Sequence, residues 1–365
     1  MLNRSLAAIT LSAVFALASG CANSGNSNIL PMQREAREGQ GLTSLAGRGR
    51  VRIREFSDLP EYSDYYSPAA IAAGPDGRLW VTDTVDQDYG ENAVVGIATS
   101  GKRRNTFYYP GVSSEGSSFD DITAGPDGAL WITDEYNEQI VRMATGGKFS
   151  SFPLKNFTAP FSIVVGPDGA LWFTATARHT TGAIGRITTT GSIKVYPAPA
   201  WTWDIAAGAD GALWFTEPYV DRVGRISTQG IIKEYSTGIT PGSQPYSIAA
   251  GPDGALWFTE RAGRIGRITT SGKVTEYSSG ITPSEEPTDI AAGPDGNMWF
   301  TEAENGSSSY YSRNAKIGSI TVSGGIKEYS RGLNSLSHPT GIVAGADGRM
   351  WFVESAADKT GRITI

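Results

Sequence analysis

One short pattern recurs seven times along the 365 residues, and it constrains the fold more than any other feature. The pattern is G-x-D-G followed by an aromatic strand, as in GPDGALWFTE from Gly251. The copies begin at Gly74, Gly125, Gly166, Gly208, Gly251, Gly293 and Gly345, with spacings of 51, 41, 42, 43, 42 and 52 residues. A period in the low forties with four short strands per unit is typical of a propeller blade. We therefore predict an all-β fold, a seven-bladed β-propeller with four-stranded blades.

Each repeat divides into four short strands. The first is a run of small and β-branched residues, such as residues 248–250, whose side chains suit the crowded centre of a ring. The P-D-G turn then offers a proline-favoured position and a glycine able to adopt positive φ, as a tight hairpin needs. The segments LWFTE, IGRIT and KVTEY supply the second, third and outer strands. Alternation along LWFTE predicts that Trp257 and its six counterparts are buried between blades.

The two ends of the repeat region complement each other. The last unit ends with its third strand, at residues 362–365, and no outer strand follows. Residues 51–56, VRIREF, match the outer-strand pattern and precede the first complete unit. We expect them to pair onto the last blade, because this closes the ring and removes an open sheet edge.

Composition limits the partners. The net charge is −6 and the pI about 5.2, which disfavours a nucleic-acid partner because phosphate binding needs a basic face. No apolar run after residue 25 approaches the roughly 20 residues that span a bilayer. The single cysteine, Cys21, excludes an intrachain disulfide. We expect a monomer.

The N-terminus is typical of an export signal. Residues 1–20 contain Arg4, an apolar stretch and small residues, which predicts a signal peptide. Cys21 follows Ala-Ser-Gly, where a bacterial lipobox places its lipidated cysteine, whereas cleavage after Ala18 would give a secreted protein. Residues 21–48 then form the lipidated cysteine and a flexible tether, and residues 49–365 the propeller. We expect a lipid anchor in the cell envelope as the only membrane contact, and periplasmic and outer-surface locations both stay open.

The repeats disagree in the segment before each inner strand, here called the lead-in segment. The seven lead-in segments read SPAAI, SFDDI, APFSI, WTWDI, QPYSI, EPTDI and HPTGI. Variable residues on a rigid scaffold are typical of a binding rim. The ligand-binding candidates are Trp201, Trp203, Tyr246, Thr288, Asp289 and Thr340. Trp201 and Trp203 are the two tryptophans that the repeat does not require.

Acidic residues end the second strands, at Asp83, Asp134, Glu217, Glu260, Glu302 and Glu354. One interpretation is structural: they hold loops or the arginines of the IGR segments, Arg186, Arg225 and Arg267. The other is that some of them line a site below the rim.

At GPDGALWFTE…IGRITTSGKVTEY the chain resembles the virginiamycin B lyase (streptogramin lyase) family of seven-bladed propellers, over about residues 49–365. The resemblance implies a magnesium-dependent elimination that opens the ester linkage of a cyclic depsipeptide. In that family the last lead-in segment reads EPHGI, with a metal-binding Glu and a His base. The preceding one carries a substrate-contacting His, and a further metal-binding Glu follows the last WF strand.

The family's chemical residues are largely replaced in this chain. His338 stands in place of the metal-binding Glu and Thr340 in place of the base, while Thr288 replaces the substrate-contacting His. Glu354 is a counterpart of the last metal-binding Glu. A threonine hydroxyl is not a general base at neutral pH.

Two functions remain open. The chain is either a binding module that holds a small-molecule, peptide or glycan ligand in its axial funnel without a cofactor, or an enzyme with a rearranged site. In the second case Glu286 and Glu354 would hold Mg²⁺ or Ca²⁺, and His338 would be the catalytic base of a lyase or hydrolase. We favour the binding module, because a propeller alone implies no chemistry.

Overall fold

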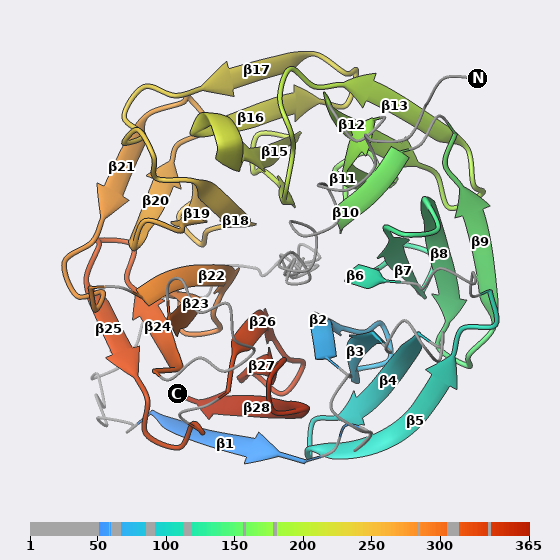
Figure 1. Cartoon of the computed structure of the whole chain (residues 1–365), viewed down its shortest axis with the longest axis horizontal. Coiled ribbons are helices and arrows are strands. Elements are labelled where there is room, and N and C mark those ends of the chain that lie inside the picture. Colours follow the sequence, from blue (N-terminus) through green and yellow to red (C-terminus); the bar gives the residue numbers. More distant parts are fainter. Residues whose placement is uncertain are drawn as a thin grey trace, which may run out of the picture.

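The structure is a computed structural model that describes residues 51–57, 59, 67–84, 92–111, 118–155, 158–177, 181–283, 285–304, 314–334 and 337–365. Cys21, the signal peptide and the tether therefore lie outside the described residues. Seven four-stranded antiparallel sheets form a ring, which confirms the predicted β-propeller (Figure 1). No helix in the described ranges is long and apolar enough to cross a membrane.

The strands of each blade follow one another outward from the axis (Figure 1). Blade 1 consists of β2 (Ser67–Ala73), β3 (Leu79–Thr84), β4 (Ala93–Ala98) and β5 (Lys102–Tyr108). Blade 2 consists of β6 (Phe119–Ala124), β7 (Ala129–Asp134), β8 (Gln139–Ala144) and β9 (Phe149–Pro153). Blade 3 consists of β10 (Thr158–Val165), β11 (Leu171–Ala177), β12 (Thr181–Ile187) and β13 (Ile193–Pro197). Blade 4 consists of β14 (Ile205–Ala207), β15 (Ala212–Glu217), β16 (Arg222–Ser227) and β17 (Ile232–Tyr235), and the short 3-10 helix η2 (Pro218–Val220) lies between β15 and β16. Blade 5 consists of β18 (Pro245–Ala250), β19 (Leu256–Glu260), β20 (Arg264–Ile268) and β21 (Val274–Tyr277). Blade 6 is β22 (Glu285–Ala292), β23 (Met298–Glu304), β24 (Lys316–Ile320) and β25 (Ile326–Tyr329).

Blade 7 joins the two ends of the propeller. It consists of β26 (Pro339–Ala344), β27 (Met350–Glu354), β28 (Lys359–Thr364) and β1 (Arg52–Phe56). β1 pairs antiparallel with β28, and Arg52 lies opposite Thr364. Lys359 Nζ contacts Glu55 Oε2 at 3.1 Å, and the Phe56 ring stacks on Trp351 at 5.5 Å. The predicted closure is confirmed.

The second-strand tryptophans form the core between blades, as predicted. Trp257 is fully buried against the inner and second strands of blade 6, and its ring stacks on Tyr277 of its own outer strand at 5.7 Å. Its indole N–H donates to Asp253 Oδ1 at 3.1 Å, and Arg267 Nε donates to Asp253 Oδ2 at 2.7 Å. The same Asp–Trp–Arg arrangement recurs in blades 2, 3 and 4. The IGR arginines therefore bind the aspartates of the P-D-G turns rather than the second-strand acids.

Glycine is needed at the turn between the third and outer strands. Gly272 has φ of +94°, and an added Cβ would lie 2.2 Å from the ring of Tyr235, on the outer strand of the preceding blade. The turn thus lets neighbouring blades approach closely. The P-D-G and T-x-G turns share one face of the ring. The lead-in segments and the loops after the second strands share the other face, here called the funnel face.

Candidate functional site

Four aromatic rings stack along the funnel face of blades 3, 4 and 5. Phe161 stacks on Trp201 at 5.7 Å and on Trp203 at 5.3 Å, and Trp203 packs on Tyr246 at 5.0 Å. We call these four residues the aromatic stack. All four come from lead-in segments, within the four residues before an inner-strand isoleucine. Three of the predicted ligand-binding residues, Trp201, Trp203 and Tyr246, are therefore brought together.

Trp203 is an interior member of the stack. Only 4% of its surface is exposed, since Phe161 and Tyr246 pack against its ring. Its backbone carbonyl accepts the Thr174 hydroxyl of blade 3 at 2.6 Å, which ties the stack to the neighbouring blade. Trp201 is only half-buried, and Tyr219, which is 74% exposed, meets it edge-on at 5.9 Å. Trp201 thus offers ring surface, whereas Trp203 is almost fully covered.

The edges of the stack carry unsatisfied donors. The indole nitrogens of Trp201 and Trp203 are buried and have no hydrogen-bond partner, and the same holds for the Thr340 hydroxyl on blade 7. A buried polar group without a partner costs about 1–3 kcal/mol. Two of these groups belong to the aromatic stack, and the third lies in the lead-in segment of blade 7.

A charged cluster lies beside Tyr246. The Arg261 guanidinium stands over the Tyr246 ring, 4.2 Å from its centroid, and Arg261 Nε lies 3.8 Å from Glu286 Oε2. Burial, aided by the Arg261 charge, lowers the pKa of His338, so its imidazole is neutral at pH 7. His338 Nδ1 lies 3.2 Å from the Ser355 hydroxyl. Burial raises the pKa of Glu286, and Arg261 opposes that rise. The sequence analysis missed Arg261, because it belongs to no repeated motif.

The two threonines at the family's histidine positions lie in the wall between blades 6 and 7. Thr288 Oγ1 is 2.7 Å from Thr301 Oγ1, so its hydroxyl is already engaged. The Thr340 carbonyl accepts the Thr301 hydroxyl at 3.1 Å. Neither side chain can take up a proton from carbon at neutral pH.

Asp289 is a predicted ligand-binding residue whose carboxylate bonds within the wall. It accepts the backbone N–H of Ile290 and of Ile342, both at 2.6 Å, and the Ser247 hydroxyl at 2.8 Å. Burial raises the pKa of Asp289 well above its usual value. The geometry gives this carboxylate a role in joining blades 5, 6 and 7.

Asp289 belongs to an arc of alternating carboxyl and hydroxyl groups around the axis. Its members directly precede the inner-strand isoleucines of five successive blades: Asp121, Ser162, Asp204, Ser247 and Asp289. Ser162 Oγ lies 2.9 Å from Asp121 Oδ2 and 2.6 Å from Asp204 Oδ1. One hydroxyl proton cannot serve both carboxylates, so the geometry calls for a further proton on one of them. The alternation of Asp and Ser can be read from the lead-in segments, but the sequence does not show the hydrogen bonds that join these side chains across blades.

The second-strand glutamates are fully buried and face outer-strand glutamates. Burial and the nearby Glu328 raise the pKa of Glu302 to about 9. Glu217 and Glu260 follow the same pattern, with pKa values of about 8, next to Glu234 and Glu276. These carboxyls are therefore largely protonated at neutral pH, which supports their structural interpretation.

The proposed metal ligands do not form a metal set. Glu354 is buried, and Glu55 and Lys359 are close enough to influence its pKa, which burial raises to about 7. Glu286 instead faces Arg261. Within the described ranges, no three His, Cys, Asp or Glu side chains gather in a way that could hold a metal ion. The donor set therefore does not fit Mg²⁺ or Ca²⁺ at Glu286 and Glu354.

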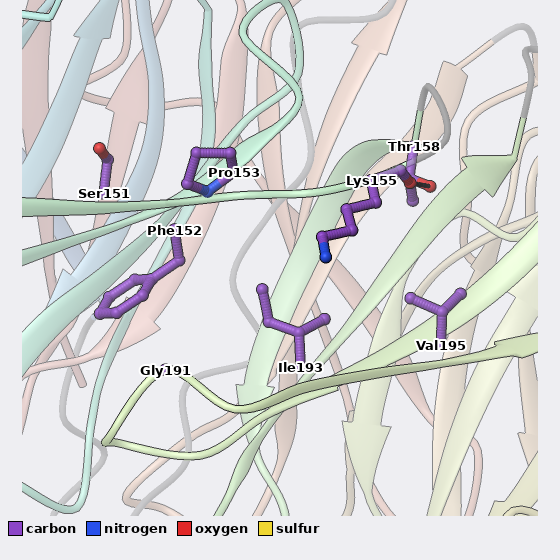
Figure 2. Close-up of a pocket in the computed structure, with 8 residues that line it drawn as sticks. All are labelled: Ser151, Phe152, Pro153, Lys155, Thr158, Gly191, Ile193 and Val195. Carbon is purple, nitrogen blue, oxygen red and sulfur yellow. Dashed lines mark hydrogen bonds between the residues drawn. The ribbon is translucent and has the colours of Figure 1, made fainter.

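A groove of about 520 Å³ lies away from the funnel, between the outer strands β9 and β13 of blades 2 and 3. Figure 2 shows Phe152, Ile193 and Val195 along it, with the Lys155 side chain extending between the two strands. Sequence analysis did not predict this groove. Its apolar lining follows from the outer-strand positions that continue the core between these two blades.

Comparisons with known proteins agree with this architecture. The sequence model of the Virginiamycin B lyase family matches residues 54–307 and 200–365. A solved structure of a catalytically inactive histidine-to-alanine variant of virginiamycin B lyase from Staphylococcus aureus, with quinupristin, is 31% identical. It has a TM-score of 0.71, and the match covers 87% of this chain and 100% of that one.

Two further structures are similar to the chain. Selenomethionine-substituted virginiamycin B lyase from Staphylococcus aureus is 31% identical, with a TM-score of 0.71, covering 87% of this chain and 100% of that one. A streptogramin B lyase structure is 29% identical, with a TM-score of 0.70, covering 86% and 97%. A comparison with curated proteins gives no match. The shared blades and the family match lead to one conclusion: the chain belongs to the virginiamycin B lyase family.

Proposed function

We propose that this chain is a binding protein built on the streptogramin-lyase propeller, which holds its ligand on the funnel face and does not open it as the lyases do. The aromatic stack carries this proposal. It gathers Trp201, Trp203 and Tyr246 where the seven repeats differ, and two of its indole N–H groups are buried without partners. A ligand that accepts hydrogen bonds would satisfy them.

The replaced residues support binding without the family's elimination. Thr340 and Thr288 stand where the resemblance places a base and a substrate-contacting histidine. Loss of a positioned base alone typically costs 10²–10⁴ in rate. We therefore assign the chain's residues to ligand contact and orientation, and we assign no step to a metal ion.

A rearranged lyase or hydrolase is the second candidate, and one observation favours it. His338 Nδ1 lies 3.2 Å from the Ser355 hydroxyl, and burial lowers the pKa of this histidine, so its imidazole has the protonation state of a general base at pH 7. In this case His338 would take a proton from the substrate, and the Ser355 hydroxyl would orient its ring.

Quinupristin, the compound bound by a solved relative, separates these candidates. Calorimetry would measure its binding to the full chain and to Trp201→Ala, and mass spectrometry would detect ring opening with and without Mg²⁺. We expect binding that Trp201→Ala weakens, and an intact ring. Efficient ring opening that His338→Gln abolishes would establish the rearranged enzyme. Absence of quinupristin binding to the full chain would count against the proposed binding function.

We also propose that Cys21 carries a lipid that ties the propeller to the cell envelope. The support is the position of the chain's single cysteine directly after an apolar export signal. Metabolic labelling with palmitate should mark the wild-type protein, and Cys21→Ala should abolish the label and release soluble protein. Unlabelled, soluble wild type would instead support secretion after cleavage at Ala18.

A further inference from the structure

Positive charge is concentrated on the outer strands of two neighbouring blades, 7 and 1. The strands β1 and β5 together carry five exposed basic residues: Arg52, Arg54, Lys102, Arg103 and Arg104. The outer strands of the other five blades carry at most one basic residue each, and three of them also carry a glutamate. The repeat does not account for this charge, so it is a property of one edge of the ring.

The two basic strands lie next to each other. The turn before β5 packs on the end of β1, because a Cβ added to Gly101 would collide with the Phe56 ring. Arg362 of β28 joins the same two elements: its Nη1 donates to the Thr99 carbonyl at 3.1 Å, and its Cζ lies 5.3 Å from the centre of the Phe56 ring. Figure 1 shows β1 and β5 following one another around the rim. The five cations therefore form one patch, here called the basic edge.

The charge of the basic edge is not neutralised within the described part of the chain. Among these residues, none of the five cations has an ion-pair partner. The two acids that border the patch pair with other bases, Glu55 with Lys359 and Asp347 with Arg349, both at 3.1 Å. The edge is thus locally positive on a chain whose net charge is −6. Such a contrast attracts and orients a negatively charged partner.

The basic edge lies where the chain enters the propeller. Lys102 directly follows the T-S-G turn of residues 99–101, and Arg52 pairs with Thr364 at the far end of β28. Both strands therefore begin on the face of the ring that carries the P-D-G and T-x-G turns, here called the turn face. The residues ahead of β1 lead to Cys21, for which we propose a lipid. The patch thus lies on the side of the propeller from which that attachment would be made.

We propose that the basic edge binds the anionic headgroups of a phospholipid bilayer, so that the propeller rests on the membrane at blades 7 and 1. Basic residues near such a surface each contribute about fivefold to the affinity, and clusters of them next to a membrane attachment are typical of anionic-lipid binding. The contact adds to the lipid proposed for Cys21 and fixes an orientation that a flexible tether alone would not. This inference goes beyond ligand binding in the funnel and does not depend on it.

Vesicle sedimentation provides the test, with the full chain carrying Cys21→Ala so that no lipid can be attached there. Vesicles of phosphatidylcholine alone are compared with vesicles that also contain phosphatidylglycerol. We expect binding to the anionic vesicles only, and its loss at about 1 M salt, where charges are screened beyond roughly 3 Å. The double variant Arg103→Gln with Arg104→Gln should weaken this binding roughly tenfold or more.

Lys233→Gln with Lys273→Gln is the matched control. It removes the same charge from exposed positions on blades 4 and 5, across the ring from the basic edge (Figure 1), and it should leave vesicle binding nearly unchanged. All four residues are exposed, so both double variants should melt at the temperature of the parent chain.

Three results would overturn the inference: no binding to anionic vesicles, equal binding to neutral and anionic vesicles, or equal losses in the two double variants. Retention on immobilised DNA without vesicle binding would identify a nucleic acid as the partner instead. Quinupristin binding and palmitate labelling are separate measurements, so the proposed function can stand where this inference fails.

Discussion

The Asp204 carboxylate of blade 4 accepts the backbone N–H of Ile248 in blade 5 at 2.7 Å. It also accepts the N–H of Ile205 in its own blade at 2.7 Å, so one carboxylate joins two inner strands beside the axis. Asp121 bonds Ile163 of the next blade in the same way, at 2.8 Å. Blade 4 is thus joined to blade 5, and blade 2 to blade 3, by a buried carboxylate as well as by packing.

Asp204→Ala should markedly lower the melting temperature. It leaves the N–H groups of Ile205 and Ile248 buried without an acceptor, at roughly 1–3 kcal/mol for each stranded group. Asp221→Ala is the control. Asp221 also bonds across to blade 5, through Gly242 N at 2.7 Å, but these contacts are solvent-exposed. Equal melting temperatures for the two variants would contradict a special role for the axial arc.

Stability should fall as the pH rises from about 5 to 9. The pKa values of Glu217 and Glu260 are raised to about 8 and that of Glu302 to about 9, so the folded state retains protons that the unfolded chain has lost. Each retained proton lowers the free energy of unfolding by about 1.4 kcal/mol per pH unit between the unfolded and folded pKa values. Chemical denaturation across this range measures the slope, which Glu302→Gln should reduce. A free energy of unfolding that rises with pH over this range would show that the folded state does not retain these protons.

Removal of the closing strand should destabilise the propeller. A chain lacking residues 1–57 loses the pairing of β1 with β28 and the Phe56 ring on Trp351, and it exposes a sheet edge. A chain lacking residues 1–46 retains all of these contacts and serves as the control. We expect a much lower melting temperature for the shorter chain, and matching temperatures would show that closure contributes little.

Trp203→Ala and Trp201→Ala should separate stability from binding. Because Trp203 is buried within the stack, its truncation should cost about 3–5 kcal/mol of unfolding free energy. Trp201 is half-buried at the end of the stack, so Trp201→Ala should cost less stability while weakening ligand binding. Thermal denaturation with calorimetric titration of quinupristin measures both. A stable Trp203→Ala variant would show that this ring faces the funnel.

Restoring the family's residues should restore its chemistry, if their replacement is what removed it. The triple variant Thr288→His, Thr340→His and His338→Glu recreates the lead-in residues that the resemblance implies for metal and base. We expect magnesium-dependent ring opening of quinupristin in this variant and none in wild type, followed by mass spectrometry. Rapid ring opening by wild type would instead indicate a relocated base at His338.

The repeats predicted the scaffold because equivalent residues occupy equivalent positions in all seven blades. Alternation alone placed Trp257 between blades, and the unmatched ends of the chain predicted the pairing of β1 with β28. The partner of Arg267 was harder to predict. Arg267 lies opposite Trp257 on the adjacent strand, so both reach Asp253, whereas Glu260 is three residues further along and points to the other side of the sheet.

The site was less predictable, because it depends on residues that occur once. The lead-in segments identified Trp201, Trp203 and Tyr246, but sequence did not show that Trp203 would be covered by its neighbours. Arg261 occurs in no motif, and its position over Tyr246 depends on the conformation of the turn between β19 and β20. Contacts between residues that do not repeat require the three-dimensional arrangement.

The closing strand β1 also determines the face of the propeller at which the chain enters the ring. β28 runs from the funnel face toward the turn face, and Arg52 pairs with Thr364 at its far end. The chain therefore enters the propeller from the side opposite the aromatic stack, at the outer edge of blade 7 (Figure 1). An attachment through the residues ahead of β1 would therefore be made at the turn face, and the aromatic stack lies on the face opposite that point of attachment.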